Sequence, residues 1–206
     1  MATADIIPAP RSDARKLGRR QEIFAAAARV FHRKGYHGTR IQDVAEELGM
    51  QKGSLYYYIS SKEDLLRGLV EGPIQQMIDD ARDVLATRHG AARKLAMVIE
   101  SHLRCFQEHK DVWGIFLKED LDLLNRNAAC DVRRLARQYH NLWEQLLRTG
   151  MQNGEFDPEL EPRVVVKAII GMCDGTYTWF RPDGAFPIQE IARIFAGFAL
   201  KGVEAR

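Results

Sequence analysis

The sequence predicts an all-α protein with a small N-terminal unit and a larger C-terminal one. Apolar residues recur every three or four positions through most of the 206 residues, as on the buried face of a helix. Glycine and proline separate these periodic stretches, and no stretch between turn signals alternates apolar and polar residues as a strand would. We therefore expect helices and no sheet.

The charge of the chain is uneven along its length. Residues 1–62 hold 11 basic and 6 acidic side chains, a net of +5, whereas the rest hold 19 basic and 22 acidic ones, a net of −3. The total is only +2. A positive N-terminal unit on a neutral or acidic body is typical of proteins that bind phosphate groups.

The first expected elements are a mobile arm over residues 1–16 and a helix over residues 19–34. The arm contains two prolines and no periodicity, and its basic residues could lie along a phosphate backbone or simply be solvated. The helix has an apolar stripe and should end at Gly35. It would brace the two short helices that follow, which are too short to be stable alone.

Those two helices are expected between residues 39 and 60, joined by a tight turn. Thr39 is a suitable N-cap for the first helix, and Gly49 can end it in the left-handed conformation. The second begins near Gln51 and turns Leu55 and Ile59 inward. Two such helices form a helix-turn-helix, so we assign residues 17–62 to a DNA-binding unit with three helices.

Hydroxyl, amide and basic side chains are expected on the outer face of this unit. Amine and phenol groups suit phosphate oxygens, and amide groups and rings suit base edges in a major groove. The candidates for DNA contact are Thr39, Arg40, Gln51, Lys52, Ser54, Tyr56, Tyr57 and Lys62. Tyr56 and Tyr58 could instead be packing residues.

The stretch GMQKGSLYYYISSKEDLL resembles the recognition-helix signature of the TetR family of bacterial transcriptional regulators. Eight residues match the family pattern: Gly49, Gly53, Leu55, Tyr56, Ser61, Lys62, Glu63 and Leu65. Gln51, Tyr58 and Ile59 depart from it. The resemblance covers residues 19–71 strongly. It implies a dimeric regulator that binds a palindromic operator in double-stranded DNA, most commonly as a repressor, and that is released by a small-molecule effector.

Residues 63–206 are expected to form a helical effector-binding and dimerisation bundle. A helix from Lys62 should continue through Pro73 with a kink, because the apolar period persists to Leu85. Further helices are expected over residues 91–109, 112–117, 126–153, 162–179 and 187–202. The last two carry a broader apolar stripe than one core contact requires. The resemblance implies that they pair with a second copy, although burial inside one chain is the alternative.

Aromatic and polar side chains of this body are candidates for an effector pocket, although most such residues belong to ordinary cores. The candidates are His102, Phe106, Trp113, Phe116, Tyr139, Trp143, Met172, Tyr177, Trp179 and Arg181. The segment TYTWFRPDGAF resembles one found in TetR regulators that respond to acyl-CoA thioesters. There Arg181 would bind a phosphate and Trp179 would stack on an adenine. A plain turn at residues 181–184 is the alternative for this segment, and a hydrophobic drug-like ligand is the alternative effector.

Other functional classes find little support in the sequence. No catalytic or nucleotide-binding motif occurs, and the six histidines form no pair at metal-ligand spacing, so we expect no enzyme, cofactor or metal. The three cysteines lie far apart, and no apolar run suits a signal peptide or a membrane span, so we expect a cytoplasmic protein. A helical adaptor without DNA binding would leave the tyrosine-rich second helix unexplained.

Overall fold

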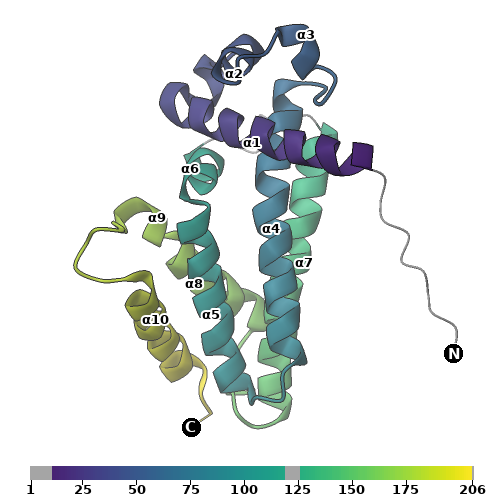
Figure 1. Ribbon diagram of the computed structural model, residues 1–206. Coiled ribbons are helices and arrows are strands. Elements are labelled where there is room, and N and C mark those ends of the chain that lie inside the picture. Colours follow the sequence, from purple (N-terminus) through teal and green to yellow (C-terminus); the bar gives the residue numbers. More distant parts are fainter. Residues whose placement is uncertain (1–10, 119–125, 206) are drawn as a thin grey trace, which may run out of the picture. The chain divides into compact units, whose positions relative to one another are not determined.

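Helices make up most of the described chain (Figure 1). The computed structural model describes residues 11–118 and 126–205, with side chains for residues 18–114 and 130–205. The elements are α1 (Arg11–Gly38), α2 (Ile41–Glu47), α3 (Lys52–Leu55), α4 (Lys62–Ala86), α5 (Ala91–Glu108), α6 (Lys110–Lys118), α7 (Arg126–Gln152), α8 (Pro162–Asp174), α9 (Thr176–Trp179) and α10 (Ile188–Val203). Within these ranges the one extended pairing is an isolated bridge between Phe156 and Glu204. The all-α prediction is confirmed.

The chain divides into two compact units between Leu69 and Val70. The first unit contains α1, α2, α3 and the first two turns of α4, and the second contains the rest. The division falls inside α4, about two turns after the boundary expected at residue 62. The reason is packing: Leu65 and Leu69 at the start of α4 are buried, and Gly68 lies directly against the ring of Phe24 in α1.

Helix α1 is longer at both ends than the sequence predicts. It begins at Arg11 rather than Arg19, so residues 11–16 of the expected arm are helical, while residues 1–10 lie outside the described part. Gly35 has φ 71° and ψ 162°, which breaks the helical geometry where the sequence places the end. A glycine is suited to this position because a Cβ makes positive φ costly. The three residues after it are helical again.

The core of the first unit comes mainly from α1. Ile23, Ala27, Val30 and Phe31 are at most 1% exposed, and they are joined there by inward-facing residues of the next elements. Those residues are Val44, Ala45, Leu55, Ile59 and Leu65. The inward positions predicted for Leu55 and Ile59 are therefore confirmed. Burial of this stripe holds α3, which is only four residues long, in place.

Ion pairs add to the contact between α1 and α2. Arg29 and Arg33 bind the carboxylate of Glu47, and Lys34 binds Asp43 at 2.8 Å. Hydrogen bonds from Arg33 and Arg29 lower the pKa of Glu47. The groups are largely exposed, so these pairs set the register of the two helices more than their stability.

Helix α5 is the centre of the second unit. Its buried side chains include Leu95, Val98, Ile99 and Leu103, and it packs against α7, α8 and α10. Polar pairs connect it to α4. Arg104 binds Asp80 at 3.1 Å, and Gln76 of α4 forms hydrogen bonds with Glu108 and His109 at the end of α5. Figure 1 shows α10, in yellow-green, running alongside α5.

The helix expected over residues 162–179 is divided in two. Helix α8 ends at Asp174, and α9 starts at Thr176 after Gly175. Thr176 is buried, and its hydroxyl donates to the Cys173 carbonyl at 2.7 Å. This side-chain bond competes with the regular backbone pattern, which explains why the apolar period alone did not reveal the break.

The turn that follows α7 connects it to the start of α5 and to the C-terminal residues. Both carboxylate oxygens of Glu155 accept from the backbone N–H groups of Ala91 and Ala92, at 2.9 and 3.1 Å. Phe156 is fully buried against Gly150, where a Cβ would lie 2.1 Å from its ring. Glu155 therefore supplies the N-terminal cap that Gly90, which has no side chain, cannot provide.

Replacing this cap should destabilise the protein in a pH-dependent way. Glu155→Gln is expected to lower the free energy of unfolding by about 1 kcal/mol at pH 7, measured by urea denaturation. The two backbone donors lower the pKa of Glu155 below its ordinary 4.5, so the contribution is complete above that value. It should be lost as the pH falls through the lower folded-state pKa. Glu159→Gln in the same loop is exposed and should cost nothing; equal losses in both variants would contradict the cap.

Candidate functional site

A short exposed segment of the first unit presents polar and aromatic side chains together. Helix α3 and the turn after it expose Gln51, Lys52, Ser54, Tyr56 and Tyr57, while Leu55 lies inward. Tyr57 is 70% exposed and Tyr56 47% exposed, which is unusual for such large rings. Tyr56 is therefore not a core packing residue.

The side chains of this segment also contact one another. The rings of Tyr57 and Tyr58 meet edge to face with centroids 5.0 Å apart, and Lys52 Nζ lies 5.9 Å from the ring centre of Tyr56. The result is a surface with phenol, amine, amide and hydroxyl groups. Such a surface can donate hydrogen bonds to phosphate oxygens and to base edges.

Thr39 has a different role from the one the sequence indicates. The prediction that it caps α2 is wrong, because the N-cap is Arg40, whose backbone N–H donates to Asp43 Oδ2 at 2.7 Å. The Thr39 hydroxyl instead donates to the Gly35 carbonyl at 2.7 Å. The break at Gly35 leaves that carbonyl in need of a donor. Thr39 is 2% exposed, so its phosphate contact stays a prediction, whereas Arg40 is exposed.

Lys62 is held by the loop between α1 and α2. Its Nζ donates to the carbonyls of Tyr36 and Thr39, at 2.9 and 3.0 Å, and lies 4.3 Å from the centre of the Tyr36 ring. These contacts orient the ammonium toward the protein and fix the loop. The phosphate contact expected of Lys62 stays a prediction, and the structure adds an internal role that the sequence did not indicate.

The second unit contains an apolar cavity with a polar wall. It offers about 450 Å³ of empty space between α4, α5, α6, α7 and α8. The lining residues are Ile74, Met77, His102, Phe106, Trp113, Ala136, Tyr139, His140, Ile170 and Asp174. Size and composition are typical of a small-molecule site, which is mostly apolar with a few convergent polar groups.

A chain of hydrogen bonds forms the polar wall. His102 lies 3.1 Å from Asp174 Oδ1 through Nε2 and 3.0 Å from the Tyr139 hydroxyl through Nδ1. A carboxylate can only accept, so in neutral His102 the proton is on Nε2, and Nδ1 accepts from Tyr139. Burial raises the pKa of Tyr139 well above its ordinary value, which keeps this phenol protonated. His102 is thus a satisfied, buried pocket histidine.

Aromatic rings form the apolar wall. Phe106 stacks on His102 at 5.0 Å and on Trp113 at 4.7 Å. Trp143 is 1% exposed and meets the rings of His102 and Tyr139 edge to face. Trp143 therefore packs against His102 and Tyr139 on the side away from the cavity.

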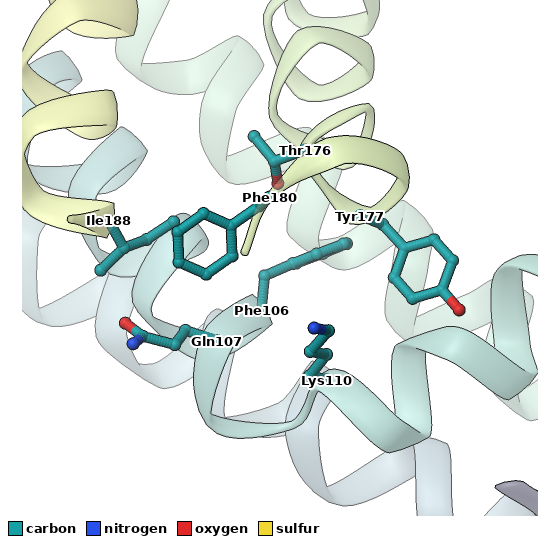
Figure 2. A pocket seen from close by; sticks show the side chains of 7 residues that line it. All are labelled: Phe106, Gln107, Lys110, Thr176, Tyr177, Phe180 and Ile188. Carbon is teal, nitrogen blue, oxygen red and sulfur yellow. The ribbon is translucent and has the colours of Figure 1, made fainter. Parts of the chain in front are cut away.

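A smaller cavity lies on the other side of Phe106 (Figure 2). It has about 270 Å³ of empty space and is lined by Phe106, Gln107, Lys110, Thr176, Tyr177, Phe180 and Ile188. Gly114 permits the approach of Tyr177, because a Cβ there would lie 2.6 Å from the Tyr177 hydroxyl. Figure 2 shows the Phe106 ring between the side chains of Ile188 and Phe180 and that of Tyr177.

The structure brings together only part of the predicted ligand set. His102, Phe106, Trp113 and Tyr139 line the larger cavity, and Tyr177 lines the smaller one. Trp143 lies behind the wall, Met172 is half-buried outside both linings, and Trp179 and Arg181 are exposed. The side chain of Phe116 lies outside the described residues.

Several residues that line the cavities were not among the predicted candidates. Asp174 is the most important of them, since it lies 72 positions from the histidine that it binds. A carboxylate at the end of an apolar helix was the available signal. His140 and Lys110 gave none, because a single polar residue in an amphipathic helix is ordinary.

Helices α8 and α10 expose apolar side chains. Phe198 is 72% exposed, Val164 63% and Ile194 38%. Ala168 and Gly171 continue the exposed line on α8, at the helical spacing of Val164. A face of this composition on a folded unit is typical of a protein interface.

The described residues do not favour other chemistry. No group of three or more metal-binding side chains occurs among them, and none of their helices is long and apolar enough to cross a membrane. Burial raises the pKa of Cys105 to about 12 and also raises that of Cys173, so neither thiol is a nucleophile at neutral pH.

Known proteins share this organisation. Residues 23–69 match the bacterial regulatory proteins of the tetR family, and residues 89–203 match the tetracyclin repressor-like C-terminal domain. The HTH-type transcriptional repressor KstR2 of Rhodococcus jostii (strain RHA1) is 22% identical over 197 residues, which cover 95% of this chain and 97% of that protein.

Solved structures agree with this match. The TetR family transcriptional regulator PfmR from Thermus thermophilus is 27% identical, with a TM-score of 0.80 over 87% of this chain and 97% of that one. The transcriptional regulator FadR from Bacillus subtilis, solved in complex with stearoyl-CoA, is 25% identical, with a TM-score of 0.75 over 89% and 99%. The two family matches cover the helix-turn-helix and most of the second unit, so the chain belongs to the TetR family of bacterial transcriptional regulators and not to an enzyme family.

Proposed function

We propose that this regulator is a homodimeric repressor that binds a palindromic operator and is released by an acyl-CoA thioester. The observation that carries the proposal is the pair of sites on one chain: an exposed polar and aromatic segment at α3, and an apolar cavity in the second unit. DNA binding would place it in the cytoplasm, where bacterial DNA lies.

Helix α4 is the proposed link between the two sites. Its first turns bury Leu65, Leu66 and Leu69 in the DNA-binding unit, and Ile74 and Met77 of the same helix line the cavity. Pro73 has no N–H for the Leu69 carbonyl, so the helix lacks one regular hydrogen bond where the two units divide. A ligand that moves Ile74 and Met77 would change the direction of α4 at this point.

The proposed mechanism is a population shift. Without effector, the two DNA-binding units of a dimer would match successive major grooves, about 34 Å apart. Effector would bind better to a conformation with another spacing. The free energy of DNA binding would then become less favourable, by at most the difference between the effector's binding free energies for the two conformations.

The choice of effector rests on likeness. FadR, which is 25% identical, was solved with stearoyl-CoA. The exposed Trp179 and Arg181 are available for the adenine and phosphates of a CoA group outside the cavity, while the apolar cavity would take part of the acyl chain.

Operator release tests this proposal. The operator is first selected from random duplex DNA, and its complex with the protein is followed by fluorescence anisotropy. We expect stearoyl-CoA or a shorter acyl-CoA to release the DNA, and free CoA to have no effect. Arg181→Ala should weaken the response about tenfold by removing a charge-assisted bond, whereas Arg93→Ala, an exposed arginine on α5, should not. Release by no acyl-CoA would refute the effector class, and selection of no sequence would refute the operator.

Lys52 and Lys62 should behave differently in the same assay. Lys52→Ala is expected to weaken binding to all DNA sequences alike and to reduce the slope of log K against log salt by about one. Lys62→Met removes the donors to the Tyr36 and Thr39 carbonyls, so it should also lower the thermal stability of the protein, which Lys52→Ala should leave unchanged. An unchanged salt slope for Lys52→Ala would exclude its phosphate contact.

The exposed face of α8 and α10 is the proposed dimer interface. Phe198→Glu should raise the dimer dissociation constant by at least about tenfold, because it places two charges where two rings would be buried. Sedimentation equilibrium measures this constant. Gln189→Glu adds the same charge on the opposite side of α10 and should leave the dimer intact. A monomeric parent protein, or a dimer insensitive to Phe198→Glu, would contradict the assignment.

A further inference from the structure

The larger cavity has one formally charged group in its described lining. Asp174 carries a negative charge, and the other lining side chains are apolar, aromatic or imidazole groups. Burial lowers the pKa of His140, so this imidazole is neutral near pH 7 and does not compensate the carboxylate. No lysine or arginine occurs among these lining residues.

The hydrogen-bond chain uses up the donors of the polar wall. The Tyr139 hydroxyl gives its proton to His102 Nδ1, and His102 gives its Nε2 proton to Asp174 Oδ1. The groups of this chain that are left to meet a ligand are lone pairs, on the phenol oxygen and on the second carboxylate oxygen; the neutral imidazole of His140 also lines the cavity and has one N–H. This part of the cavity therefore presents acceptors and negative charge.

The position of Asp174 allows its carboxylate to act on a ligand in the cavity. Its side chain is 36% exposed, whereas His102 behind it is 1% exposed, so the carboxylate lies on the open side of the chain. The stacked rings of Phe106 and Trp113 and aliphatic side chains form the rest of the wall, which gives the carboxylate a largely apolar surrounding. Repulsion between like charges is stronger in such a setting than in bulk water.

We infer that Asp174 is a specificity-determining residue of the cavity: it excludes ligands whose cavity-bound part carries a carboxylate and favours neutral groups that donate a hydrogen bond, such as a hydroxyl. This inference rests on the proposed function in one respect, that the effector binds in this cavity. It adds that a free fatty acid is rejected by charge, although its chain is as apolar as that of its neutral counterparts. A neutral hydroxyl group gains the bond to Asp174 that a carboxylate cannot make.

Two probes of equal chain length separate charge from hydrophobicity. The full-length protein is titrated at pH 7.5 with 1-decanol and with decanoate, below the concentrations at which either aggregates. Tryptophan fluorescence reports binding, because Trp113 lines the cavity and Trp143 contacts His102 and Tyr139. We expect decanol to bind about tenfold or more tightly than decanoate.

The variant Asp174→Asn removes the charge and keeps an acceptor for His102. In this variant the preference for decanol over decanoate should shrink to about twofold or less, mainly because decanoate binds better. Asp83→Asn removes the same charge from an exposed position on α4 and should keep the full preference. A thermal unfolding curve without ligand checks that both variants are folded.

Two results would overturn the inference. One is a parent protein that binds decanoate as well as decanol, or binds neither, and this result does not depend on any variant. The other is a folded Asp174→Asn protein with an unchanged preference. These titrations contain no DNA and no CoA, so failure of acyl-CoA to release the operator would refute the proposed effector and leave this selectivity standing.

Discussion

One helix contributes side chains to both hydrophobic cores, and the organisation of the protein depends on it. The first turns of α4 are buried with α1 in the DNA-binding unit, and its later turns are buried with α5 or line the cavity. Neither core can be rearranged near α4 without an effect on that helix. Its regular hydrogen bonding is interrupted at Pro73, close to the point where the units divide, so bending is easiest there.

The DNA-binding unit shows how so short an element as α3 can be positioned. Leu55 and Ile59 fasten it to the core, and Lys62 fastens the loop between α1 and α2 through two carbonyls and a ring. With the backbone held in this way, the exposed tyrosines need no packing role. Lys62, a candidate for DNA contact by its chemistry, therefore also stabilises the inside of this unit.

The cavity combines an apolar volume with a directional polar wall. Its stacked rings would bind many hydrophobic molecules with little discrimination, because dispersion and burial are not directional. Selectivity has to come from groups with charge or with fixed donors and acceptors. The chain from Tyr139 through His102 to Asp174 is such a group, and it is assembled from three different helices.

The sequence alone determined the all-α class, the order of the two units and the position of the helix-turn-helix, because helical periodicity, glycine positions and the motif at residues 49–65 are local properties; it did not determine the ends of α1 or the break between α8 and α9. It also placed His102, Phe106, Trp113 and Tyr139 among the candidates, since large aromatic residues on inward faces are visible in a periodic pattern. Only the tertiary structure decided that Asp174 meets His102, that Lys62 binds the Tyr36 and Thr39 carbonyls, and that Arg40 rather than Thr39 caps α2. These outcomes depend on distances between residues far apart in the chain, or on which of several possible donors reaches a given carbonyl, and packing sets both.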